Sequence, residues 1–113
     1  MNARHGLSDK TVAQINAVLR RFPEVEEALL FGSRAKGTYK RGSDIDLALI
    51  GNRLDWRKVG KIEDALDDIL LPYKFSLIIL GKRTDPGVAA HVGRVGMNFY
   101  QREPIKVGVR AVK

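Results

Sequence analysis

Apolar residues recur at helical spacing in three stretches, and each stretch begins at a residue that can cap a helix. Ser8, Asp55 and Asp85 are the predicted N-caps, and Pro23 and Pro72 lie beyond the first two helices. The predicted helices cover residues 8–21, 55–71 and 85–92. Their apolar faces comprise Val12, Ile15, Val18 and Leu19 in the first, Trp56, Val59, Ile62, Leu66, Ile69 and Leu70 in the second, and Val88, Ala89 and Val92 in the third.

Three shorter apolar runs predict β-strands over residues 28–31, 44–50 and 73–79. The first strand stops at Gly32, and residues 33–36 fit one helical turn that Gly37 ends. Strands that alternate with helices indicate the α/β class, here a small mixed β-sheet packed against helices.

The length of 113 residues, 44% of them hydrophobic, predicts one domain with a modest core. We expect this domain to span 1–113, with a core over about 7–100 and a basic tail over 101–113 that includes Lys106, Arg110 and Lys113. Because so short a chain has little room for an acceptor site of its own, a partner is expected to complete it. The chain has no apolar run of about twenty residues, no signal-peptide core and no cysteine, which predicts a cytoplasmic protein without a membrane anchor.

The formal charge of +7 suggests an acidic partner. A nucleotide, a nucleic acid or an acidic protein surface would each be attracted, and a merely solvated basic surface is an equal alternative. The basic residues are spread along the chain without the aromatic interleaving of a single-strand binder, so nucleic acid is a secondary expectation. The sequence is also compatible with a homo-oligomer.

The loop after the first strand combines small residues with positive charge. A helical turn directs backbone N–H groups and its positive dipole end toward its start, and Gly32 lacks the Cβ that would keep a phosphate away. Lys40 and Arg41 add charge nearby. The loop therefore predicts a polyphosphate site whose binding residues are Gly32, Ser33, Arg34 and Lys36, with Ser43 at its far end.

Asp44-Ile45-Asp46 opens the second predicted strand. Side chains two residues apart on a strand point to the same face, with Cα atoms roughly 6.5–7 Å apart. Mg²⁺ is commonly held by one or two carboxylates plus substrate phosphates. Asp44 and Asp46 are therefore predicted to bind Mg²⁺, with Mn²⁺ as the alternative ion.

Each piece alone has an ordinary explanation, since Gly-Ser after a strand is usually a turn and Asp-x-Asp is more often a solvated edge or an Asx-turn. The joint pattern is more specific, and it resembles the nucleotidyltransferase superfamily of DNA polymerase beta. The form Gly-Ser-Arg-Ala-Lys-Gly at 32–37, with Arg94-Val95-Gly96 and Phe99-Tyr100, is similar to the minimal nucleotidyltransferases, the antitoxin-like partners of HEPN-domain proteins. The resemblance covers roughly residues 7–100.

This resemblance implies a polymerase beta-like fold, ATP as substrate, and transfer of a nucleoside monophosphate, often AMP, to a hydroxyl on a HEPN-type toxin. It also implies that Gly32 and Ser33 hold the phosphates and that Asp44 and Asp46 are catalytic Mg²⁺ ligands. The superfamily places a third carboxylate on the next strand, where this chain has Ser76. Serine carries no charge for a second metal and is a poor general base.

Three functions follow from these residues. The leading one is a nucleotidyltransferase that modifies its toxin partner, with Ser76 as the third catalytic position. The second is a catalytically impaired, nucleotide-binding antitoxin that acts by protein binding, and the third is a basic nucleic-acid-binding module. His91 is assigned a structural or surface role, and Tyr39 is expected to be an exposed loop residue, with base stacking or acceptance of a nucleotidyl group as alternatives.

Overall fold

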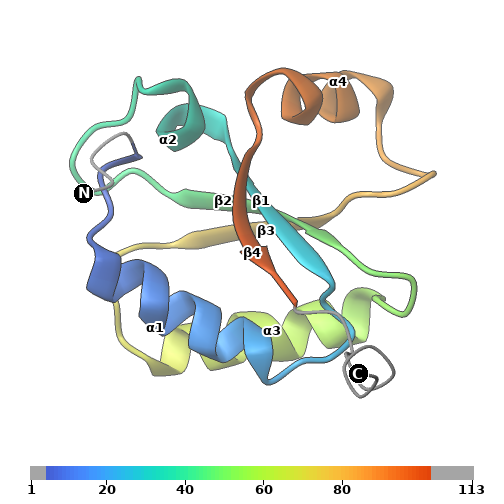
Figure 1. Cartoon of the computed structure of the whole chain (residues 1–113), viewed down its shortest axis with the longest axis horizontal. Coiled ribbons are helices and arrows are strands. Elements are labelled where there is room, and N and C mark those ends of the chain that lie inside the picture. The colour runs from blue at the N-terminus through green and yellow to red at the C-terminus, as the bar shows by residue number, and fades with distance from the viewer. Residues whose placement is uncertain (1–4, 103–113) are drawn as a thin grey trace, which may run out of the picture.

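The computed structural model describes residues 5–102, and these residues form one sheet flanked by helices on both faces (Figure 1). The sheet has four strands in the order β3-β2-β1-β4. Their bounds are Glu27–Phe31 for β1, Ile45–Ile50 for β2, Phe75–Ile79 for β3 and Met97–Gln101 for β4. Strand β1 runs antiparallel to β2 and β4, whereas β2 and β3 are parallel, which confirms the predicted mixed sheet.

Four helices connect these strands: α1 spans Asp9–Arg20, α2 Gly32–Lys36, α3 Trp56–Asp68 and α4 Pro86–Val95. Helices α1 and α3 lie side by side under one face of the sheet, and α2 and α4 lie above the other (Figure 1). The three predicted caps are confirmed, because the side chains of Ser8, Asp55 and Asp85 each accept a hydrogen bond from a backbone N–H in the first helical turn. None of these helices is long and apolar enough to cross a bilayer.

The hydrophobic core lies between the sheet and the α1–α3 layer. Ile45, Leu47 and Leu49 of β2 are fully buried in it. Since side chains alternate along a strand, the intervening residues of β2, Asp46 among them, face α2 and α4. The sequence of one strand therefore builds the core with one face and presents a carboxylate on the other.

The structure departs from the predicted elements in several places. Strand β4 was not predicted, and α4 continues to Val95. Trp56, Leu70 and Val88 were expected on packed helix faces, but they are 72%, 86% and 37% exposed. Trp56 is the first residue of α3 and Leu70 follows its last turn, so the apolar stripe of that helix runs past both ends of the core. The part of the predicted basic tail that follows Arg102 lies outside the described residues.

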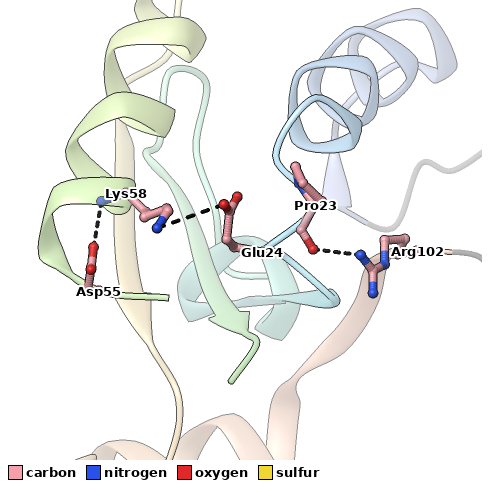
Figure 2. A network of polar contacts seen from close by, with 5 residues as sticks. All are labelled: Pro23, Glu24, Asp55, Lys58 and Arg102. Atoms are coloured by element: carbon pink, nitrogen blue, oxygen red, sulfur yellow. Dashed lines mark hydrogen bonds and ion pairs between the residues drawn. The ribbon is translucent and has the colours of Figure 1, made fainter. Parts of the chain in front are cut away.

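A polar network fixes the connection between α1 and β1. Glu24 pairs with Lys58 of α3 at 3.8 Å, and the Arg102 guanidinium donates to the carbonyl of Pro23 at 2.7 Å (Figure 2). Lys58 also donates its backbone N–H to the capping carboxylate of Asp55 (Figure 2). These contacts tie the start of α3 and the end of β4 to one connecting segment.

Candidate functional site

A row of residues from three adjacent strands marks the candidate site. Phe31 of β1 is the register partner of Asp46 in β2, and Asp46 is the partner of Ser76 in β3. Neighbouring strands lie about 4.8 Å apart, so paired side chains on one face are close neighbours. Ser76 therefore lies beside Asp46, at the position where the resemblance to the superfamily implies a third carboxylate.

The surroundings of Asp46, Asp44 among them, act on the charge of its carboxyl group. Burial raises the pKa of Asp46 above its ordinary value of 3.8, and the nearby charge of Asp44 raises it further, while His91 and Arg34 act in the opposite direction. A bound cation would offset both the burial of this carboxylate and its repulsion from the second one. Asp44 and Asp46 therefore fit the oxygen ligands of a hard divalent ion.

These two carboxylates do not complete a metal site by themselves. Within residues 5–102, no group of three or more His, Cys, Asp or Glu side chains is placed to hold an ion. The remaining ligands would have to come from substrate phosphates or water, which is the usual way in which Mg²⁺ is bound.

The raised pKa of Asp46 predicts a stability cost for the charged site. Because the folded state holds this proton more tightly than the unfolded state does, stability falls as pH rises from the ordinary value of 3.8 through the raised one. We expect Asp46→Asn to remove this dependence and to raise the free energy of unfolding at pH 7. Urea unfolding between pH 3 and 7 in chelator tests this, with Asp64→Asn on the exposed side of α3 as the control. A variant no more stable than the wild type at pH 7 would contradict it.

Gly32 brings the backbone close to this carboxylate. It has a φ of +74°, and a Cβ at this position would collide with Asp46 Oδ2. The α2 turn follows and ends as predicted at Gly37, whose φ is +87° and whose N–H donates to the Ser33 carbonyl at 2.9 Å. Among the described residues, no side chain caps the start of α2. Ser33 thus directly follows the residue whose backbone approaches Asp46.

A pair of glycine substitutions separates close approach from backbone strain. Gly32→Ala and Gly37→Ala both place a Cβ at positive φ, which costs about 1–3 kcal/mol each, but nothing lies within 4 Å of a Cβ at Gly37. We expect only Gly32→Ala to displace Asp46 and to weaken Mg²⁺-dependent nucleotide binding, measured by calorimetry. Equal binding by the two variants would show that the approach of Gly32 to Asp46 is unimportant.

Arg34 was predicted to bind the nucleotide, and the structure places its guanidinium elsewhere. The residue is 2% exposed, and its guanidinium donates to the backbone carbonyls of His5, at 2.8 Å, and Ser43, at 3.0 and 3.2 Å. It also lies 5.1 Å and 4.9 Å from the ring centroids of Tyr39 and Tyr73. Since Ser43 directly precedes Asp44, Arg34 fixes the start of the Asp-x-Asp segment to α2.

The other predicted nucleotide-binding residues remain at the edge of the site. Lys36 is exposed at the end of α2, and the Ser43 Oγ accepts a hydrogen bond from the Lys40 N–H at 2.8 Å. Tyr39 is half-buried against Arg34 rather than an exposed loop residue. The loop is thus closed on itself by Arg34 and Ser43, with Lys36 exposed to solvent.

His91, to which the sequence assigned a structural or surface role, makes structural contacts at the candidate site. It lies on α4, its Nε2 accepts the Gly32 N–H at 3.3 Å, and its ring meets the Phe31 ring edge-on at 6.0 Å. His91 thus accepts a backbone N–H that the sequence analysis expected to bind a phosphate. No local signal identifies it, because 59 residues separate it from Gly32.

The comparisons with known proteins agree with this geometry. The family described as "Polymerase beta, Nucleotidyltransferase" matches residues 13–105. The chain therefore belongs to the polymerase beta nucleotidyltransferase family, as its Gly-Ser and Asp-x-Asp segments indicated. No curated protein matches the sequence.

Solved structures with the same fold come from toxin–antitoxin complexes. A structure described as a toxin–antitoxin with AMP-PNP is 26% identical, with a TM-score of 0.67, over 81% of this chain and 74% of that one. The MntA–HepT toxin–antitoxin is 21% identical, with a TM-score of 0.64, over 84% and 74%. A tri-AMPylated Shewanella oneidensis HEPN toxin in complex with MNT antitoxin is 22% identical, with a TM-score of 0.61, over 80% and 70%. The fold expected for a minimal nucleotidyltransferase is thereby confirmed.

Proposed function

We propose that this protein is the antitoxin of a toxin–antitoxin pair and that it transfers a nucleoside monophosphate, AMP in the first instance, from ATP to a hydroxyl on a HEPN-type partner. The observation that carries the proposal is the placement of Gly32 against Asp46, with Asp44 and Ser76 beside it. The structures with AMP-PNP and with an AMPylated HEPN toxin support the choice of nucleotide and partner.

In this proposal the nucleotide phosphates bind at Gly32 and Ser33, where a phosphate oxygen would replace His91 Nε2 as the acceptor of the Gly32 N–H, and Lys36 adds a positive charge from solvent. Asp44 and Asp46 would hold Mg²⁺, which would supply charge neutralisation at the phosphates. The acceptor oxygen attacks the α-phosphorus, the bond from that phosphorus to the bridging oxygen breaks, and pyrophosphate leaves with that electron pair. The hydroxyl proton passes to solvent or to a base that the partner supplies.

A second candidate follows from Ser76. Because this serine is the register partner of Asp46 and is a poor general base, the site would bind Mg²⁺ and ATP but transfer the nucleotide slowly. The protein would then neutralise its partner by binding, with the nucleotide as a ligand. The two candidates share every residue of the site and differ only in transfer.

Calorimetry with ATP, with and without Mg²⁺, followed by incubation with α-labelled ATP and the co-expressed HEPN-type partner, tests the proposal. Mg²⁺-dependent binding with label on the partner is the expected result. Binding without label supports the binding-only antitoxin. The absence of ATP binding would overturn both and leave the family fold without nucleotide chemistry.

A further inference from the structure

The most exposed aromatic side chain among the described residues lies at the opposite end of the sheet from the site. Trp56 is 72% exposed at the start of α3. Tryptophan is among the costliest residues to leave in water and among the most frequent anchors of protein interfaces. The backbone at this position is held in the first turn of the helix, since Asp55 caps it by accepting the Lys58 N–H at 2.9 Å.

Trp56 borders a groove between two loops. These loops, 51–55 after β2 and 80–85 after β3, leave the same end of the parallel strand pair (Figure 1). The groove has a volume of about 640 Å³. Its walls combine apolar and basic side chains, namely Leu54, Trp56, Ile79, Leu80, Lys82 and Arg83.

Hydrogen bonds hold both loops in place without a ligand. Thr84 accepts the Gly81 N–H at 2.7 Å and donates to the Ile79 carbonyl at 3.2 Å. In the other loop the Leu54 N–H donates to the Gly51 carbonyl at 3.3 Å, and a Cβ on Gly51 would collide with the Glu24 carbonyl. The groove is therefore a preformed surface, which lowers the cost of binding.

The charged side chains that line the groove are both positive. Lys82 and Arg83 are exposed there, and the Glu24–Lys58 ion pair involves neither of them. Arg53 is also exposed, but it lines a separate hollow with Glu24 and Glu26. The two carboxylates on these loops, Asp55 and Asp85, accept backbone N–H groups as helix caps. A ligand that brings its own negative charge would thus be attracted here.

We propose that this Trp56 groove is a docking surface for an acidic segment of a partner protein that inserts an aliphatic side chain beside Trp56. The aliphatic walls favour such a segment over nucleic acid, because phosphates gain nothing from Leu54 or Ile79 and one exposed ring offers no stacking series. Asp46 and Ile50 lie about 13 Å apart along β2, so the groove is separate from the nucleotide site and does not depend on transfer.

Fluorescence provides a direct test, because Trp56 is the sole tryptophan of the chain. The full chain is titrated with a 12-residue peptide of alternating glutamate and leucine, with polyglutamate of equal length, and with an oligothymidylate of 12 nucleotides. We expect the Glu-Leu peptide to bind saturably and to shift the emission to shorter wavelength, and polyglutamate to bind at least about tenfold more weakly for want of the aliphatic contact. An equal response to polyglutamate, a response to oligothymidylate alone, or no shift would each overturn the proposal.

A charge-reversed variant localises the binding. The double variant Lys82→Glu with Arg83→Glu should bind the Glu-Leu peptide about tenfold or more weakly, since each exposed attraction is replaced by repulsion. Lys10→Glu with Arg20→Glu, on exposed positions of α1, makes the same change in net charge and should leave the affinity nearly unchanged. Equal losses in the two variants would show that net charge alone drives binding and would contradict a local groove. ATP binding should be the same in both, so failure here is distinguishable from failure of the nucleotide site.

Discussion

Changing both Asp44 and Asp46 to asparagine is expected to abolish Mg²⁺-dependent binding of ATP and to lower transfer by at least about 10³-fold, because a bound cation supplies several kcal/mol of charge stabilisation. Asparagine keeps the size of each side chain and removes the negative charge that attracts the ion. The loss should be visible by calorimetry in Mg²⁺ and by label transfer to the partner.

The matched control for this variant is Asp64→Asn with Asp67→Asn. Both residues are exposed on α3, so the net charge changes equally while the site stays intact. Undiminished Mg²⁺-dependent affinity in the Asp44, Asp46 variant would mean that these aspartates are not the metal ligands. A loss of folding would be recognised by circular dichroism, although the pKa of Asp46, which burial and Asp44 raise, predicts greater stability once its charge is removed.

Changing Ser76 to aspartate is expected to raise the rate of transfer by about 10²–10⁴-fold, the usual contribution of a positioned general base. The parallel register places residue 76 beside Asp46, so the new carboxylate would join Asp44 and Asp46 around one point. The rate is measured with α-labelled ATP and the HEPN-type partner at saturating Mg²⁺.

The same substitution should lower stability in chelator, because a third negative charge enters a site where the pKa of Asp46 is already raised. Added Mg²⁺ should restore stability. Ser76→Asn, which has the size of aspartate without its charge, is the control and should give neither effect. A rate unchanged by Ser76→Asp would argue that serine does not limit transfer and that a base from elsewhere, such as the partner, serves instead.

Local pattern predicted most of the fold because its signals are contained in short segments. The caps Ser8, Asp55 and Asp85 and the alternation of β2 depend on neighbours within a few residues, and they are found as expected. Strand β4 was missed because polar residues interrupt Met97–Gln101, so that it is no continuous apolar run, and because its strand conformation depends on pairing with β1, which lies far away in the chain.

The charged and polar residues of the sequence indicated candidate site residues, but not the role of each one. Arg34 looked like a phosphate ligand because it stands in a basic loop, yet it is buried between two tyrosine rings and holds backbone carbonyls. His91 was assigned a structural or surface role, and no local signal connected it with Gly32, which is remote in sequence. The residue type limits which groups a side chain can bind, whereas its packing in the folded chain determines which of them it contacts.

Residue types at fixed spacing were enough to indicate the family, the α/β class and the combination of a Gly-Ser turn with two aspartates and an uncharged third position. The folded chain was needed to show that Ser76 lies beside Asp46 and that Gly32 approaches that carboxylate too closely for any Cβ. It also showed that the buried Arg34 holds backbone carbonyls and that Trp56 is exposed at the far end of the sheet. These features could not be predicted because strand register and helix packing are set by burial of the whole core, which no short segment contains.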